Sequence, residues 1–123
     1  MFMLNELLGG TIIDSGSNAN GDYIKFSNGT LICTKKKVFS GVSCNTAYGS
    51  LYETGDLDLG DYAHPFVGNN PIVFVNKIAN YGCICYGVSS ATLTSFGTTN
   101  LMTPRSWNTA SFGLGLLAIG RWK

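Results

Sequence analysis

The sequence predicts an all-β fold, a small antiparallel β-sandwich, on three observations. Short runs rich in β-branched and aromatic residues recur along the chain. Clusters of Gly, Asn, Asp, Ser or Pro separate these runs roughly every 8–12 residues, the spacing typical of short strands in sandwiches and barrels. No helical period persists over a long stretch, and the 123 residues suffice for one domain with a single core.

Composition narrows the class of protein. Hydrophobic residues make up 45% of the chain and charged residues only 12%, about half the usual charged share of a soluble domain. This balance excludes intrinsic disorder, and no stretch approaches the ~18 apolar residues of a transmembrane helix, so we expect no membrane insertion. The net charge of +1 gives no argument for nucleic-acid binding. So few surface charges predict that other copies of the chain cover part of its surface.

The N-terminal part predicts a polar segment followed by a hairpin. Residues 1–9 favour one or two helical turns, and residues 11–22 have the composition of turns and loops. The alternating strands 23–26 and 31–34 flank Asn28-Gly29, which is the strongest short-range hairpin signal. We expect a two-residue type I′ turn there, with positive φ at both positions.

The rest of the chain predicts further short strands. Residues 38–52 favour a strand with a loop at 43–50. The run from Asp56 to Asp61 alternates acid and leucine, so we expect the acids in water and the leucines in the core. This run lacks the Gly and Glu spacing of a calcium-binding EF-hand loop. Pro71 stands at the start of a strand, where proline is tolerated. Strands are expected at 72–75 and around 82–88, 91–96 and 114–122.

Four cysteines and one lysine run need an interpretation. The separations between Cys33, Cys44, Cys83 and Cys85 do not match the pairs of zinc ribbons, and the last two are too close for a comfortable mutual disulfide. Instead of disulfides or zinc, we expect buried, reduced thiols that act as small hydrophobes. The run 35–37 is interpreted as a solvated loop or as protection of an edge strand, with a phosphate-contacting patch as the alternative.

Nothing in the sequence singles out a catalytic site. Three of the seven acids lie in the surface-like run 56–61, and the single histidine, His64, precedes a proline. Neither a G-x-S-x-G motif nor a Gly-rich phosphate loop before a helix is present. We therefore expect no enzyme activity, no catalytic residue, no metal site and no cofactor.

A carbohydrate-binding surface requires less, because aromatic rings stack on sugar faces and amides and hydroxyls bond sugar hydroxyls. The segment 103–108 is richest in such chemistry, and Arg105 suits an anionic glycan. Trp107 could equally pack in the core or at a subunit interface, whereas Trp122 is expected to be a buried anchor whose N–H finds a partner. The candidate ligand-binding residues are Tyr48, Tyr52, Tyr81, Arg105, Trp107 and Asn108.

Two motifs at opposite ends of the chain carry a family resemblance. Residues 17–33 read S-N-A-N-G-D-Y-I-K-F-S-N-G-T-L-I-C, and residues 118–123 read A-I-G-R-W-K. The chain thereby resembles the C-terminal receptor-binding domain of bacteriophage tail fibres, which opens on such a stretch and ends on A-I-G-R-W. Its middle also resembles the H-type lectin-like sandwich. The resemblance places the domain at 17–123, after an N-terminal segment or linker at 1–16.

The resemblance also implies an assembly and a function. It implies a parallel homotrimer at the tip of a phage fibre, assembled in the host cytoplasm and carried on the virion. The expected partner is a bacterial cell-surface receptor, with a glycan as its chemical class. Residues 1–16 would lie near the trimer axis, where three copies of His64 could hold a metal as an alternative to a structural histidine. A polysaccharide depolymerase fragment, a purely structural trimerisation domain and a non-phage H-type lectin are the alternative functions.

Overall fold

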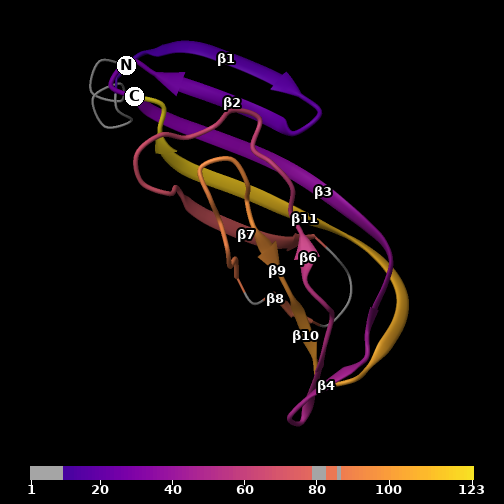
Figure 1. The fold of residues 1–123 in the computed structure, drawn as a ribbon. Helices are drawn as coiled ribbons and strands as arrows, with labels where there is room; N and C mark the ends of the chain where they lie inside the picture. The colour runs from indigo at the N-terminus through magenta and orange to yellow at the C-terminus, as the bar shows by residue number, and fades with distance from the viewer. Residues whose placement is uncertain (1–9, 79–82, 86) are drawn as a thin grey trace.

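The computed structural model describes residues 10–78, 83–85 and 87–123, and its strands are antiparallel throughout (Figure 1). These residues contain no helix, so the predicted all-β antiparallel sandwich is confirmed. The helical turns expected at 1–9 lie outside the described residues. The strands are β1 (Ile12–Asn18), β2 (Gly21–Phe26), β3 (Thr30–Cys44), β4 (Thr46–Tyr48), β5 (Leu51–Glu53), β6 (Leu57–Asp58), β7 (Ile72–Ile78), β8 (Ile84–Cys85), β9 (Thr98–Thr99), β10 (Leu101–Thr103) and β11 (Trp107–Arg121).

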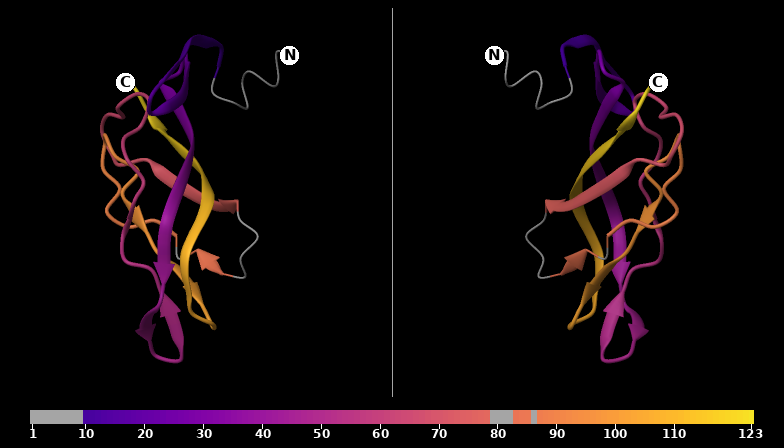
Figure 2. Two further views of the ribbon diagram at one scale, coloured as in Figure 1. Left: turned by 90° about the vertical axis from the view of Figure 1, so that its right-hand side faces the viewer. Right: turned by 90° about the vertical axis from the view of Figure 1, so that its left-hand side faces the viewer.

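The strands form two layers. A five-stranded sheet has the order β1-β2-β3-β11-β7, and its long strands β3 and β11 run almost the length of the molecule (Figure 1). A four-stranded sheet, β4-β5-β10-β8, and the pair β6-β9 make the second layer. Figure 2 shows this second layer against one face of the five-stranded sheet, which we call the inner face. The opposite face is the outer face.

The core lies between the inner face and the second layer. Leu114 and Leu116 of β11 are buried on the inner face, because alternate side chains of a strand point to the same side. The run 56–61 covers them with the buried side chains of Leu57 and Leu59, while its acids are exposed. The predicted alternation of this run is therefore confirmed.

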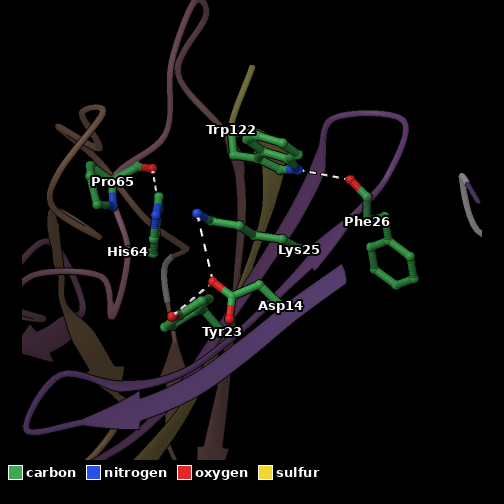
Figure 3. A network of polar contacts seen from close by, with 7 residues as sticks. All are labelled: Asp14, Tyr23, Lys25, Phe26, His64, Pro65 and Trp122. Carbon is green, nitrogen blue, oxygen red and sulfur yellow. Dashed lines mark hydrogen bonds and ion pairs between the residues drawn. The ribbon is translucent and has the colours of Figure 1, made fainter. Parts of the chain in front are cut away.

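The two end motifs of the sequence pack against each other. The backbone N–H of Trp122 donates to the carbonyl of Gly29 at 2.9 Å, and the Arg121 guanidinium donates to the carbonyl of Asn28 at 2.8 Å. Figure 3 shows the Trp122 indole N–H donating to the carbonyl of Phe26, at 2.8 Å. Trp122 is half-buried rather than fully buried, but its predicted role as a structural anchor with a satisfied N–H is confirmed.

The hairpin at 23–34 is confirmed, but its turn differs from the prediction. Gly29 has a φ of 98°, whereas Asn28 is not among the residues with positive φ. The Gly29 N–H donates to the carbonyl of Phe26 at 3.0 Å, so Ser27-Asn28-Gly29 is a three-residue loop that ends on a left-handed glycine. The Asn28 side chain stabilises this form, because its Oδ1 accepts the N–H of Thr30 at 2.9 Å.

Two segments expected to be loops are strands. Residues 12–18 form β1, which pairs with β2 at the edge of the sheet and crosses the domain boundary expected after residue 16. Its polar composition suits an edge strand, because one side of such a strand faces water. The expected loop 43–50 is the end of β3 followed by the β4–β5 hairpin, which turns at Gly49 with a φ of 60°.

Strand predictions in the second half are partly wrong. Residues 91–96 form a turn, in which Thr92 Oγ1 accepts the N–H groups of Thr94 and Ser95 at 3.2 and 3.0 Å. Here local side-chain bonding outweighs β-propensity. The strand expected at 114–122 begins at Trp107, and β9 and β10 were not predicted. The strand start after Pro71 is confirmed.

Candidate functional site

Five of the six predicted ligand-binding residues lie at one end of the molecule. This distal end consists of residues 43–53 and 103–109, and it lies opposite the C-terminus and the start of β1 (Figures 1 and 2). The sixth, Tyr81, lies outside the described residues. The five at the distal end are Tyr48, Tyr52, Arg105, Trp107 and Asn108.

A buried thiol joins the strands that carry these side chains. Cys44 is fully buried at the end of β3, and its Sγ lies 3.4 Å from the carbonyl oxygen of Tyr52 and 3.6 Å from that of Leu101. Burial raises the pKa of the Cys44 thiol, so the sulfur keeps the proton that it donates. Trp107 pairs with Cys44, and Thr103 pairs with Tyr52. The prediction of buried, unpaired thiols is confirmed for Cys44 and Cys33, whereas Cys83 and Cys85 are unpaired but only half-buried.

The loop that carries Arg105 is held by Thr103, the last residue of β10. The buried hydroxyl of Thr103 donates to the carbonyl of Arg105 at 3.0 Å and accepts its N–H at 3.3 Å. These two bonds fix the backbone of Arg105, while its side chain is exposed. The guanidinium is therefore presented to water from a defined position.

An amide pair and a strained residue lie beside this loop. The Asn45 side-chain amide donates to Asn108 Oδ1 at 2.7 Å, and both side chains are exposed. Thr109 has a φ of 54°, a left-handed conformation that is costly for a β-branched residue. Register shifts on both sides of Ala110 accompany it. Such strain is concentrated at functional sites in proteins, so this bulge is a second indication that the distal end is a functional site.

Trp107 serves packing as well as the surface. Its half-buried ring meets Phe112 edge to face, with centroids 6.3 Å apart, and Phe112 stacks on Phe39 at 5.6 Å. The alternative interpretation of Trp107, packing in the core, is therefore correct for the buried part of its ring. Tyr48 is more exposed than Trp107, with 53% of it in contact with water.

Two hollows of about 540 and 390 Å³ in the described part of the chain lie along the five-stranded sheet, and neither is lined by a distal-end residue. At the distal end, an exposed ring, an amide pair and a cation are side chains that suit contact with a polymer. Sequence reasoning missed Asn45, although its position in the expected loop 43–50 was a signal that could have included it.

The lysine run lies in a strand, β3, so the expected loop is wrong. The run pairs with β11 on one side, whereas the pairing of β3 with β2 ends at Thr34, just before the run. Protection of a strand edge therefore stays a prediction for these lysines. Lys35 reaches across to the second layer, where its Nζ donates to the carbonyls of Leu59 at 3.1 Å and Asp61 at 2.6 Å. Burial lowers the pKa of Lys35, and the charge of Lys37 lowers it further. Lys35 therefore links the two layers by hydrogen bonds. It can do so because its place in β3 directs its side chain towards the second layer.

His64 lies near the opposite end, beside β2. Figure 3 shows its ring next to Tyr23, with centroids 5.1 Å apart, and its Nδ1 lies 2.8 Å from the carbonyl oxygen of Pro65. Because a carbonyl only accepts, this contact places a proton on Nδ1. Tyr23 donates in turn to Asp14, which pairs with Lys25 at 3.8 Å. Within the described ranges, no three metal-ligating side chains of one chain gather at a common point.

Comparisons with protein-family models, with curated proteins and with solved structures found no significant match. The resemblance to phage fibre domains thus remains a prediction from the two end motifs. Separately, no helix in the described part of the chain is long and apolar enough to cross a membrane.

Proposed function

We propose that this protein is the receptor-binding tip of a bacteriophage tail fibre, and that its distal end attaches to a glycan on a bacterial surface. The observation that carries the proposal is that the segments 43–53 and 103–109, which contain five residues with side chains suited to sugar binding, lie at the end opposite the C-terminus (Figure 1). The phage assignment is supported by the motifs at 17–33 and 118–123.

Each part of the distal end has a role in this proposal. The exposed ring of Tyr48 stacks on the apolar face of a sugar, and the Asn45–Asn108 amide pair bonds its hydroxyls. Arg105 recognises a carboxylate or phosphate group on the polymer, since its planar guanidinium matches such groups with two parallel bonds.

A surface of this kind binds each sugar segment weakly. Several linked copies that engage one polymer together raise the overall avidity by orders of magnitude without any new contact. A homotrimer, as the resemblance implies, would supply three such surfaces. The proposed role is binding, so incubation with capsule or lipopolysaccharide should release no reducing sugar, and such release would favour a depolymerase instead.

The test is adsorption of the fluorescently labelled protein to a panel of bacterial strains, with competition by their purified surface polysaccharides. Tyr48→Ala and Arg105→Ala should each weaken binding roughly 5- to 30-fold, since loss of one stacked ring or one charged hydrogen bond costs about 1–2 kcal/mol. Val67→Ala is the matched control, because Val67 is 43% exposed and bonds by its N–H to Arg121 at the other end. Binding that both distal variants retain in full would overturn the proposal.

A further inference from the structure

The outer face of the five-stranded sheet carries an unusual amount of apolar side chain. Four isoleucines face one another directly across four neighbouring strands, from β2 to β7. Two further rows follow along the sheet, one through Leu117 and Phe74 and one through Val38 and Ile78. The isoleucines of the first row are Ile24, Ile32, Ile119 and Ile72.

Much of this face is in contact with water in the single chain. Its five most exposed apolar side chains are between 37% and 65% exposed: Val38, Ile72, Phe74, Ile78 and Ile119. Together they leave on the order of 500 Å² of apolar surface, near the top of the range for monomers and more than half of one partner's share of a standard interface.

The same face also contains a hollow. Gly115 of β11 lies between the second and third of these rows, and the absence of a side chain there leaves a depression of about 540 Å³. Phe74 and Asn76 of β7 border it on one side, Thr34 and Lys36 of β3 on the other, and Leu117 lies next along β11. One face thus presents protruding apolar side chains and a recess that could receive such side chains.

We propose that the outer face is an interface between copies of this chain, in which apolar side chains of β7 from one copy fill the hollow over Gly115 of another. The outer face carries both the protruding side chains and the recess that such a contact between two copies needs. Charges on the rim agree with this occupant, because a carboxylate, Asp22, and an ammonium group, Lys36, both lie beside the hollow, which gives two copies groups of opposite charge. A lipid surface would require a cluster of cations, whereas the outer-face rows contain one lysine.

This inference concerns a different surface from the proposed glycan site, so the two can fail separately. The test is the mass of the full chain in solution, measured by light scattering over a range of concentrations. The wild type should be a multiple of the 13.1 kDa chain. Ile72→Lys should reduce it to the mass of one chain, because a charge cannot be buried unpaired in an apolar interface.

A matched control removes the effect of surface charge in general. Ile84 in β8 belongs to the four-stranded sheet and is 66% exposed, against 65% for Ile72. Ile84→Lys should therefore leave the assembly intact, and circular dichroism should show both variants folded. A wild type that stays monomeric, or equal assembly of Ile72→Lys and Ile84→Lys, would overturn the proposal.

A second variant tests the filling of the hollow. A Cβ at Gly115 would lie 3.4 Å from Ile78 Cδ1, an ordinary contact, so Gly115→Leu should fold as a single chain. It adds apolar surface but occupies the recess, and we expect about tenfold weaker association. Unchanged or tighter association would refute the seating of β7 side chains over Gly115. Adsorption of Ile72→Lys to cells, at lower avidity, would show that the glycan site survives without the interface.

Discussion

Substitution of Gly29 by alanine should destabilise the fold far more than the same change in another turn. Gly29 has a φ of 98°, and a Cβ at this position would lie 2.5 Å from Arg121 Nη2 and 3.1 Å from the backbone oxygen of Lys123. The loop that closes the β2–β3 hairpin is thus packed directly under the end of β11.

The expected magnitude has two parts. A side chain in the left-handed region costs roughly 1–2 kcal/mol. Arg121 must also move, which breaks its hydrogen bond of 2.8 Å to the carbonyl of Asn28. Because this guanidinium is exposed, water replaces much of the lost hydrogen bond. Together, the lost bond and the steric crowding against Lys123 should cost about 1–2 kcal/mol of folding free energy. Gly29→Ala should therefore destabilise the fold by about 3 kcal/mol.

Gly49 provides the matched control, since it has a φ of 60° and nothing lies within 4 Å of the Cβ that alanine would add. Gly49→Ala should cost only the left-handed term, about 1 kcal/mol. Urea unfolding followed by circular dichroism measures both, at one fixed protein concentration because association between copies makes the apparent stability depend on concentration. Equal destabilisation of the two variants would refute the argument that packing under β11 makes Gly29 necessary.

Three further predictions follow from the core. Leu101→Ala should destabilise by about 2–5 kcal/mol in urea, because Leu101 is fully buried, and Ile84→Ala should stay within about 0.5 kcal/mol; similar losses would contradict the assigned core. Burial raises the pKa of Tyr62 from 10.0 to about 12, so its neutral form stabilises the fold fully below pH 10 and this contribution disappears as the pH rises towards 12. Tyr62→Phe should therefore flatten the fall in stability over that window, and an unchanged slope would refute the assignment. Finally, a thiol reagent should modify Cys33 and Cys44 only after unfolding, since both are buried and their thiol pKa values are raised; rapid labelling of either in the native protein would contradict this.

Local patterns predicted those features that neighbouring residues decide. The alternation of acid and leucine at 56–61 placed Leu57 and Leu59 in the core, since a strand sends alternate side chains to one side whatever its partner. Pro71 marked the start of β7 in the same way. The candidate ligand-binding residues were predicted from their chemistry, and the sequence contained no information that 48–52 and 105–108 lie at the same end.

Where prediction failed, strand pairing decided the outcome. The polar run 12–18 becomes a strand because it pairs with its neighbour β2 across the tight connection at 19–20, although its composition is that of a loop. The lysines at 35–37 lie in a strand because β11, which is distant in the sequence, pairs with them. The turn at Asn28-Gly29 is the exception, since there a local bond of Asn28 Oδ1 overruled the type I′ preference.

The sequence by itself determined that this is an all-β domain with apolar strands, polar turns and a recognisable motif near each end, at 17–33 and 118–123. Only the tertiary structure decided why those ends go together: residues 26–29 and 121–122 are adjacent in space, and their hydrogen bonds join the β2–β3 loop to the end of β11. It also decided which apolar side chains remain exposed, gathering them on the outer face. The physical reason is that strand periodicity is set by the local backbone, whereas strand partners are chosen by burial and hydrogen bonding across the whole chain.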